Sequence, residues 1–322
     1  MGRDITAHGG GAGTGPAAAL AGDVTAPRYS PRWLALREDA DAAARATGLL
    51  DPLRAHLASE VARTGRLVIR DLGCGTGAMG RWLAARLPGP QHWILHDRDP
   101  DLLALAASGV RGPAGDGSPV TVETTRGDIT RLSPEDLAGT SLVTASALLD
   151  LLTADEVDAL AGACARARCP ALLSLSVVGR VELDPADPLD AELATAFNAH
   201  QRRVTGGRRL LGPDASAVAT AAFTRRGATV LVRPSPWRLG ADRRELTAEW
   251  LRGWVGAACE QRPDLAAAGQ AYLTRRLDAC AAGTLRVVVG HDDLLALPAA
   301  GPVEPVPVRE ADQSGPPDGE RR

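Results

Sequence analysis

The sequence contains no lysine, and every strongly basic side chain in it is an arginine. A Schiff base, a pyridoxal-phosphate attachment and the phosphate-binding lysine of a P-loop all need that side chain, so these chemistries are excluded. Cysteine is sparse: five residues occur, none in a Cys-x-x-Cys pair, so neither a zinc site nor a disulfide framework is indicated. Unpaired thiols suit a reducing compartment, and we expect a cytoplasmic protein.

Aromatic residues are also scarce, at 3% of the 322 residues, whereas apolar residues make up 45%. We therefore expect a core built mainly from alanine, leucine and valine. No apolar stretch approaches the roughly 20 residues that a membrane-spanning helix needs, and the N-terminus lacks the apolar run of a secretory signal. A net charge of −3 gives no electrostatic reason to bind nucleic acid or an anionic membrane. We expect neither as a partner.

What the chain does contain is a glycine-rich turn, Arg70–Gly80, with glycines at positions 73, 75, 77 and 80. A predicted strand, Leu67–Asp71, leads into it, and a predicted helix, Ala78–Leu87, leads out. Glycine lets the backbone turn sharply and lets a ligand approach closely, and the helix N-terminus adds unpaired N–H groups. The stretch predicts a nucleotide-binding turn in an α/β sheet.

Two nucleotide-binding families use such a turn. Gly75–Gly80 fits G-x-G-x-x-G, the dinucleotide fingerprint, which chance also produces in glycine-rich chains. The longer string Asp71–Gly77, Asp-Leu-Gly-Cys-Gly-Thr-Gly, resembles the first motif of class I S-adenosylmethionine-dependent methyltransferases. In that family the acid closes the first strand and the glycines pass beneath the methionine part of the cofactor. A tight turn without a ligand needs fewer glycines and no acid.

Two further acids stand where this resemblance requires them. Asp97 ends the predicted strand His92–His96, where an acid accepts the hydrogens of ribose hydroxyls in NAD enzymes and methyltransferases alike. Asp128, after the predicted strand Val120–Thr124, matches the family's contact with the adenine amino group, although Gly-Asp alone also forms turns. The resemblance implies that the cofactor-binding residues are Asp71, Gly73, Cys74, Gly75, Thr76, Gly77, Asp97, Arg98, Asp128, Ile129 and Ser146.

Strands and helices alternate from residue 66 onward. Alternation of this kind predicts a parallel sheet with helices on both faces, whose ligands bind at the carboxyl ends of the strands. The resemblance implies an α/β fold with a doubly wound, seven-stranded, mostly parallel Rossmann-like sheet. The remaining predicted strands are 141–146, 171–178, 229–233 and 285–289, and the remaining predicted helices are 100–108, 154–167 and 215–226.

Composition divides the chain further. Both ends are rich in Gly, Ala or Pro without apolar periodicity, which predicts disordered tails. Helical periodicity near the N-terminus predicts a cap that either covers the ligand cleft or packs on the sheet. Two long inserts interrupt the alternation, and such inserts commonly supply a substrate pocket and its lid. The predicted parts are a tail (1–27), a helical cap (28–62), a methyltransferase domain (63–298) with inserts at 179–213 and 240–283, and a second tail (299–322).

The residues beside the reacting atoms are marked less clearly. The fourth predicted strand lacks the acid-Pro-Pro-aromatic string of amino-methylating DNA enzymes and the Pro-Cys of cytosine-C5 enzymes. Strings at 197–201 and 290–296 look like a poorly characterised bacterial branch of the superfamily, and each contains a histidine. A histidine base helps only where the acceptor loses a proton, and a core or surface histidine is the alternative. The candidate catalytic residues are His200, His291 and Asp150.

We therefore predict a methyltransferase that moves the methyl group of S-adenosylmethionine to a small-molecule acceptor by in-line displacement, leaving S-adenosylhomocysteine. One alternative is an NAD(P)-dependent oxidoreductase that uses Gly75–Gly80, although no Tyr-x-x-x-Lys pair exists. The other is a non-catalytic partner protein that keeps the fold. An acceptor carboxylate would suit the arginines of the first insert, and a solvated loop is the alternative for them: Arg202, Arg203, Arg208 and Arg209.

Overall fold

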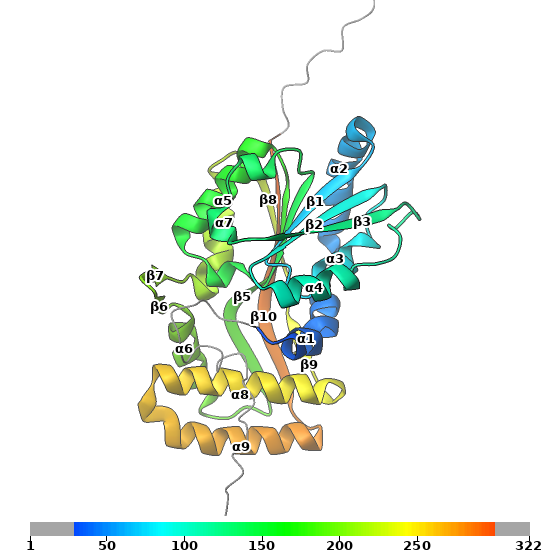
Figure 1. Ribbon diagram of the computed structural model, residues 1–322. Coiled ribbons are helices and arrows are strands. Elements are labelled where there is room, and N and C mark those ends of the chain that lie inside the picture. The colour runs from blue at the N-terminus through cyan, green and yellow to red at the C-terminus, as the bar shows by residue number, and fades with distance from the viewer. Residues whose placement is uncertain (1–28, 300–322) are drawn as a thin grey trace, which may run out of the picture.

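The structure is a computed structural model that describes residues 29–299, so the predicted tails lie almost wholly outside the described residues. An eight-stranded sheet forms its centre (Figure 1), with the order β3-β2-β1-β4-β5-β10-β8 and with β9 paired to β10. The strands are β1 (Leu67–Leu72), β2 (Gln91–Asp97), β3 (Val120–Arg126), β4 (Leu142–Ser146), β5 (Ala171–Asp184), β8 (Thr229–Pro234), β9 (Trp237–Leu239) and β10 (Arg286–Leu297).

The sheet is mostly parallel, as predicted. β1 pairs in parallel with both β2 and β4, β3 joins β2 in parallel and β5 joins β4 in parallel. β10 runs antiparallel to β5, β8 and β9. The strand order reverses between β1 and β4, so the crevice for a ligand lies beyond the carboxyl ends of these two strands. The predicted doubly wound Rossmann-like sheet is confirmed.

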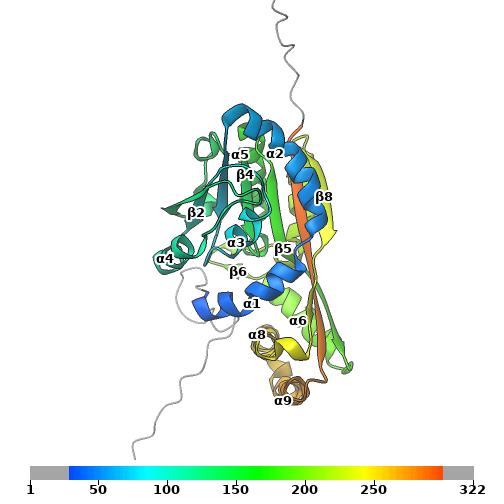
Figure 2. The ribbon, with the colours of Figure 1, turned by 90° about the vertical axis from the view of Figure 1, so that its right-hand side faces the viewer.

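Helices cover both faces of this sheet (Figure 2). Along β5 the side chains alternate: Leu172 packs with the helices of one face, and Ala171 and Leu173 pack with those of the other. This period of two is what a strand buried on both faces requires. The first face carries α2 (Leu50–Thr64), α3 (Ala78–Ala84) and α4 (Pro100–Gly109), and the second carries α5 (Ala154–Ala167) and α7 (Ala215–Thr224).

A third apolar cluster lies beyond the carboxyl ends of the parallel strands. β5 and β10 run past their neighbours to reach it, and two helices lie across its lower side in Figure 1. Its core includes Trp254, Leu251 and Tyr272, each at most 1% exposed. The helices of this layer are α1 (Pro31–Ala44), α6 (Asp190–Gln201), α8 (Arg244–Gln261) and α9 (Ala266–Ala282).

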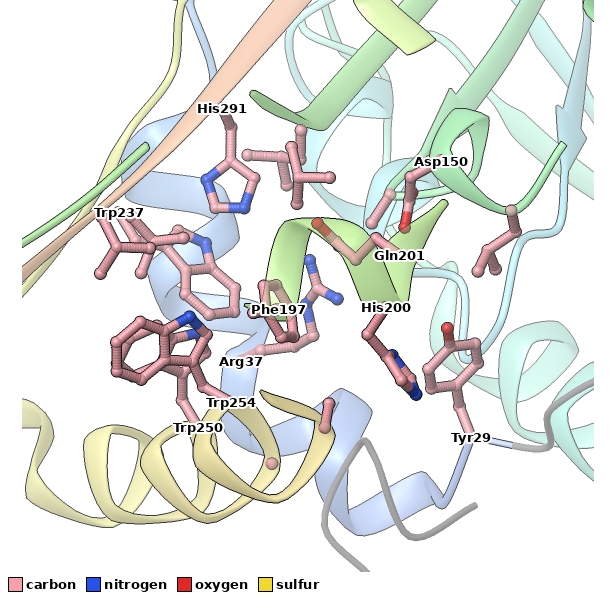
Figure 3. Close-up of a pocket in the computed structure, with 18 of the residues that line it drawn as sticks. Tyr29, Arg37, Asp150, Phe197, His200, Gln201, Trp237, Trp250, Trp254 and His291 are labelled. Carbon is pink, nitrogen blue, oxygen red and sulfur yellow. The ribbon is translucent and has the colours of Figure 1, made fainter. Parts of the chain in front are cut away.

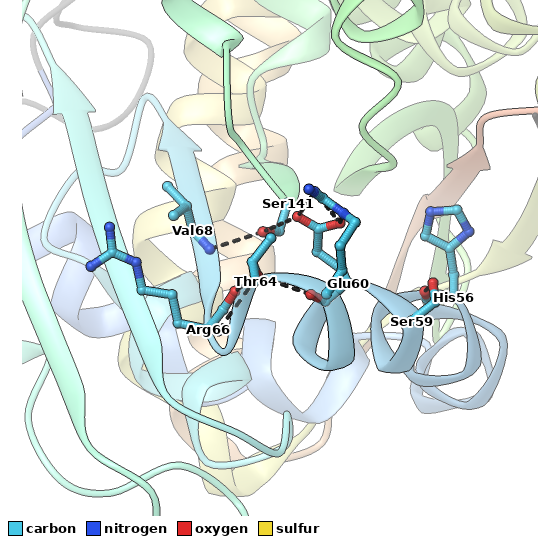
Figure 4. Close-up of polar contacts among 8 residues, drawn as sticks. His56, Ser59, Glu60, Thr64, Arg66, Val68 and Ser141 are labelled. Atoms are coloured by element: carbon cyan, nitrogen blue, oxygen red, sulfur yellow. Dashed lines mark hydrogen bonds and ion pairs between the residues drawn. The ribbon is translucent and has the colours of Figure 1, made fainter. Parts of the chain in front are cut away.

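Polar contacts join the end of α2 to the start of β1 (Figure 4). The Thr64 hydroxyl donates to the Glu60 carbonyl oxygen at 2.9 Å. The Val68 N–H donates to Ser141 Oγ at 3.0 Å, and Ser141 Oγ lies 3.5 Å from Glu60 Oε1. These bonds satisfy backbone groups at the end of α2 and at the start of β1. Asp71 lies at the other end of β1.

Two strands differ in length from their predictions. β5 continues from 178 to Asp184 and β10 continues from 289 to Leu297. The string 290–296 is therefore strand, not a separate motif, and His291 lies within β10. Charged residues interrupt both apolar runs, which hides the continuation. The structure shows the continuation: residues 286–289 pair with residues 181–184 of β5 on one side and, from Val287 to Val289, with β9 on the other.

Candidate functional site

The glycine loop after β1 has the left-handed backbone that its sequence predicts. Gly73 and Gly75 have φ angles of +63° and +54°, which L side chains rarely adopt. A Cβ at Gly75 would lie 3.2 Å from Leu34 Cδ1 of α1, and one at Gly73 would lie 3.1 Å from Leu148 Cδ1. Both positions therefore need glycine for conformation and for space.

Gly77, which the resemblance names among the cofactor-binding residues, lies at the start of α3. It precedes α3 with a φ of +84°, and a Cβ there would lie 3.0 Å from Val110 Cγ2 and 3.3 Å from the Ala106 backbone. Gly77 is absent from the lining of the cavity that its neighbours face. The absence of a side chain at Gly77 lets the start of α3 pack closely on the end of α4.

Asp97 connects the end of β2 to the glycine loop. Its Oδ2 accepts the Gly75 N–H at 2.9 Å, and its Oδ1 accepts the Asp99 N–H at 3.0 Å. Asp99 in turn caps α4 by accepting the Asp101 N–H at 3.0 Å. Each carboxylate oxygen of Asp97 can accept a second hydrogen bond, so the residue can both hold the loop and bind a ligand.

Asp128 follows β3 and faces the same space. Its Oδ1 accepts both the N–H and the hydroxyl of Thr130, at 3.0 and 2.8 Å. These bonds hold the pKa of Asp128 below its usual range despite partial burial, which acts in the opposite direction. Asp128 is therefore a carboxylate at neutral pH, with Ile129 beside it.

These residues surround a cavity of about 540 Å³ at the carboxyl ends of β1, β2 and β4. α1 and the hairpin of β6 (Val204–Thr205) and β7 (Arg208–Arg209) form its outer walls. Ten of the predicted cofactor-binding residues line it: Asp71, Gly73, Cys74, Gly75, Thr76, Asp97, Arg98, Asp128, Ile129 and Ser146.

Asp71 is buried in the wall of this larger cavity. Its Oδ1 accepts the hydroxyl of Thr144 at 2.7 Å, and its Oδ2 has no partner among the described residues. Burial raises the pKa of Asp71 to about 7, and the nearby charge of Asp97 adds to the rise. Asp71 therefore presents an unpaired oxygen that a cationic ligand group would stabilise.

Arg45, at the end of α1, is the site residue that the sequence did not reveal. It is 3% exposed and lines the larger cavity. Nη2 donates to Ser146 Oγ at 3.3 Å, while Nε and Nη1 have no partner in residues 29–299. Burial lowers the pKa of Arg45. The sequence has many arginines, and no motif or spacing distinguishes this one.

A second, smaller cavity of about 160 Å³ lies among the third apolar cluster (Figure 3). All three predicted catalytic residues line it, although they come from distant parts of the chain. His291 enters from β10 between two irregularities in the pairing with β5, where a bulge re-aims side chains. His200 enters from α6, and Asp150 from the turn after β4. The fold thus brings together the three residues that the sequence named separately.

Burial and the charge of a nearby arginine keep both histidines neutral. Arg203 Nη1 lies 3.3 Å from His200 Nδ1; because a guanidinium only donates, Nδ1 accepts and the ring proton is on Nε2, 3.3 Å from Glu260 Oε2. Burial, and then the charge of Arg203, lower the pKa of His200. Burial lowers the pKa of His291 to about 3. The pKa of Asp150, in contrast, is raised by burial.

The two cavities meet along a shared wall. Ala147, in that wall, has a φ of +51°, and Leu175, in the smaller cavity, has a φ of +58°. Left-handed backbone at non-glycine residues costs about 1–2 kcal/mol each and occurs most often at functional sites. Asp293 holds Leu175 by accepting its N–H at 2.8 Å. The residues common to both cavities are Tyr29, Arg37, Ala147, Leu151, Arg203 and Leu210.

The four arginines of the first insert have separate environments. Arg202 pairs with Asp214 at 2.6 Å, and Arg208 pairs with Glu156 at the same distance. Arg209 is exposed on β7. Only Arg203 lies where the two cavities meet. The insert therefore does not form one carboxylate clamp.

Residues 69–170 match a family model described as a methyltransferase domain. The match covers the glycine loop, Asp97 and Asp128. This part of the chain is therefore similar to methyltransferase domains. Nothing in the match favours an oxidoreductase.

Solved structures similar to this chain are distant. The cyclopropane synthase MmaA2 from Mycobacterium tuberculosis is 13% identical, with a TM-score of 0.39 over 74% of this chain and 83% of that one. A SAM-dependent methyltransferase from Geobacter sulfurreducens, in complex with S-adenosyl-L-homocysteine, is 17% identical, with a TM-score of 0.37 over 84% and 98%. Likenesses this distant support no inference about substrate. No curated protein matches the chain in sequence.

Residues 29–299 contain neither a membrane-spanning helix nor a metal-binding cluster. No helix between residues 29 and 299 is long and apolar enough to cross a membrane. The same part of the chain holds no group of three or more His, Cys, Asp or Glu side chains arranged to bind a metal ion. The candidate site therefore consists of the two adjoining cavities.

Proposed function

We propose that the protein uses S-adenosylmethionine to methylate a small-molecule acceptor, with the cofactor in the larger cavity and the acceptor in the smaller. The observation that supports this assignment is the shared wall between the two cavities. A methyl donor in one and an acceptor in the other would face each other there. We also propose that the protein acts in the cytoplasm, since its five cysteines are all free and reducing conditions keep thiols so.

The unpaired polar atoms of the larger cavity fit the methionine part of the cofactor. The free donors of Arg45 suit a carboxylate, which guanidinium groups bind through two parallel hydrogen bonds. The unpaired Oδ2 of Asp71 suits the neighbouring ammonium group. A ligand with both groups would therefore satisfy two buried groups that are costly to leave unpaired.

The other end of the cavity fits a nucleoside. Asp97 lies at the end of β2, where its oxygens can accept two ribose hydroxyl hydrogens while still holding the glycine loop. Asp128 is a carboxylate that can accept from an adenine amino group, and Ile129 provides an apolar wall for the ring.

The bound cofactor supplies an activated sulfonium methyl group. The protein then has to orient the acceptor and exclude water, which is how positioning lowers the barrier of a displacement. Helix α1 and the side chains of α6 and α8 close the smaller cavity on several sides. A dry cavity of roughly 150 Å³ holds benzene, so the smaller cavity, of similar size, suits a small molecule.

The test is the affinity of S-adenosylhomocysteine, measured by calorimetry. Charge-assisted hydrogen bonds contribute about 1.5–3 kcal/mol, so Arg45→Met should weaken binding by about 10- to 100-fold. The matched control is Arg86→Met: Arg86 also packs on the Trp82 ring, at 4.8 Å against 5.3 Å for Arg45, but it is absent from the cavity lining. Preferential binding of NADH by the wild-type protein would overturn the proposal, and an unchanged affinity in Arg45→Met would overturn the role of Arg45.

A further inference from the structure

We propose that the acceptor is a flat aromatic molecule with a phenolic hydroxyl, and that the methyl group is transferred to that oxygen. This inference rests on the methyltransferase function proposed above and concerns the smaller cavity alone. Three features support it: the aromatic walls of the cavity, its unpaired buried polar atoms, and the charges where it meets the cofactor cavity.

The smaller cavity gathers the aromatic side chains of a chain that has few. The sequence contains six Trp, two Tyr and two Phe, and six of these side chains line this cavity. Trp33 meets Trp237 edge-on at 6.4 Å, and Trp250 stacks on Trp254 at 5.2 Å. Figure 3 shows Trp237, Trp250 and Trp254 close together on one side of the cavity. Aromatic rings bind other rings through offset and edge contacts. Walls of this kind favour a flat ring over an aliphatic chain.

Unpaired polar atoms distinguish this cavity from ordinary core packing. Trp254 Nε1, His291 Nδ1 and Gln201 Oε1 are buried, and none has a hydrogen-bond partner in residues 29–299. All three side chains line the smaller cavity, and Trp254 and His291 are only 1% and 4% exposed. Each such atom costs about 1–3 kcal/mol while unpaired. A ligand with polar substituents on its ring would supply the missing partners.

The charge at the shared wall favours an oxygen nucleophile. Arg37 and Arg203 both line the two cavities, but Arg37 already pairs with Asp41 at 2.9 Å. Arg203 donates to His200, and no ion pair of Arg203 is found among the described residues. A cation at this place stabilises an oxygen anion and repels an ammonium group. The acceptor atom next to the methyl group is therefore expected to be an oxygen that becomes negative.

Asp150 can accept the proton that the phenolic hydroxyl loses. It lines only the smaller cavity, its pKa is raised by burial, and its carboxylate can accept the phenolic hydrogen. The phenolate oxygen then forms the new O–CH₃ bond as the S–CH₃ bond breaks, and the electron pair of that bond stays on sulfur. The products are a neutral aryl ether and a neutral thioether, and Asp150 later releases its proton to solvent. A carboxylate acceptor would instead place a second negative charge beside Asp150.

The experiment measures binding of four matched probes to the protein loaded with S-adenosylhomocysteine, by saturation-transfer NMR. The probes are para-cresol, methylcyclohexanol, benzylamine and benzoate. We expect para-cresol to bind at least about tenfold more tightly than each of the others, a difference of roughly 1.4 kcal/mol. Equal or tighter binding of methylcyclohexanol would overturn the aromatic acceptor, and equal or tighter binding of benzylamine or benzoate would overturn the phenolic one.

Two neighbouring arginines provide the variants. In Arg203→Met the preference for para-cresol over benzylamine should fall by about tenfold, whereas Arg202→Met should keep it, because Arg202 pairs with Asp214 away from the cavities. An unchanged preference in Arg203→Met would overturn the role of its charge. If wild-type protein does not bind S-adenosylhomocysteine, the proposed function fails. If it binds the cofactor product without preferring para-cresol, only the present inference fails.

Discussion

The two cavities of this protein are built in different ways. The larger is formed by residues that follow the ends of neighbouring strands, so its contacts come from short, local stretches such as 71–76 and 97–99. The smaller is formed by single side chains from α1, α6, α8, β9 and β10, which only the folded chain brings together. Backbone geometry therefore determines the first cavity and side-chain packing determines the second. This difference predicts that a substitution at a residue lining only one cavity should act mainly on the ligand of that cavity.

The largest expected effect is at Asp97. Asp97→Ala removes two proposed ribose contacts and also the acceptors of the Gly75 and Asp99 N–H groups. With about 1.5–3 kcal/mol for each of two charged hydrogen bonds, we expect the affinity for S-adenosylhomocysteine to fall by roughly 10²- to 10⁴-fold in calorimetry. Thermal unfolding measured in parallel should still show one cooperative transition. An affinity within threefold of wild type would remove Asp97 from the cofactor site.

Gly75→Ala should have the next largest effect. An alanine at a φ of +54° costs about 1–2 kcal/mol, and its Cβ would press on Leu34 at the cavity wall. We expect cofactor affinity to fall by about tenfold together with a loss of stability. Gly65→Ala is the matched control, since Gly65 has a φ of +76° with nothing within 4 Å of the added Cβ. It should lose stability but bind the cofactor normally, and equal binding losses in both variants would contradict a local cause.

His291, in the smaller cavity, should make the stability of the protein depend on pH. Burial, aided by the charge of Arg37, lowers its pKa from 6.5 to about 3, so between these values the native state binds fewer protons than the unfolded state. Its contribution to stability is therefore complete above pH 6.5 and is lost as the pH falls toward 3, with a slope of up to about 1.4 kcal/mol per pH unit. His291→Asn should lose stability less steeply over this range in urea unfolding. If the stability of the two proteins changed equally with pH over this range, His291 would not be held neutral.

The smallest expected effect is at Asp128. Asp128→Asn keeps an oxygen that can accept from an adenine amino group and loses only the charge. We expect a two- to fivefold weaker affinity for S-adenosylhomocysteine, about 0.4–1 kcal/mol, with binding of para-cresol unchanged. A loss as large as that in Asp97→Ala would show that the charge of Asp128, rather than its hydrogen bond, matters for binding.

The sequence predicted the features that depend on short local stretches of the chain, as in the larger cavity. Asp71, Gly75, Asp97 and Asp128 were recognised because each stands at a fixed distance from a strand end. Gly77 belonged to the same motif, yet its place in the structure is set by its packing on α4, which the motif does not describe. The strand order and mostly parallel sheet followed from the alternation of elements.

What the sequence did not predict depends on contacts between distant segments. Arg45 has no local feature that separates it from the other arginines of the chain. His200, His291 and Asp150 were named without any sign that they share a cavity or that burial keeps both histidines neutral. The aromatic side chains of the smaller cavity were not predicted to lie together, since periodicity shows that a residue is buried but not what it is buried against.

Helix α1 belongs to both cavities: Leu34 touches the glycine loop, Arg37 lies in the shared wall and Arg45 reaches the proposed carboxylate site. A ligand that steadies this helix in one cavity therefore changes the free energy of binding in the other. By thermodynamic linkage such a coupling is reciprocal: the cofactor would change the affinity for the acceptor by the same factor by which the acceptor would change that for the cofactor. Helix α1 is thus the element through which the two proposed ligands would affect each other.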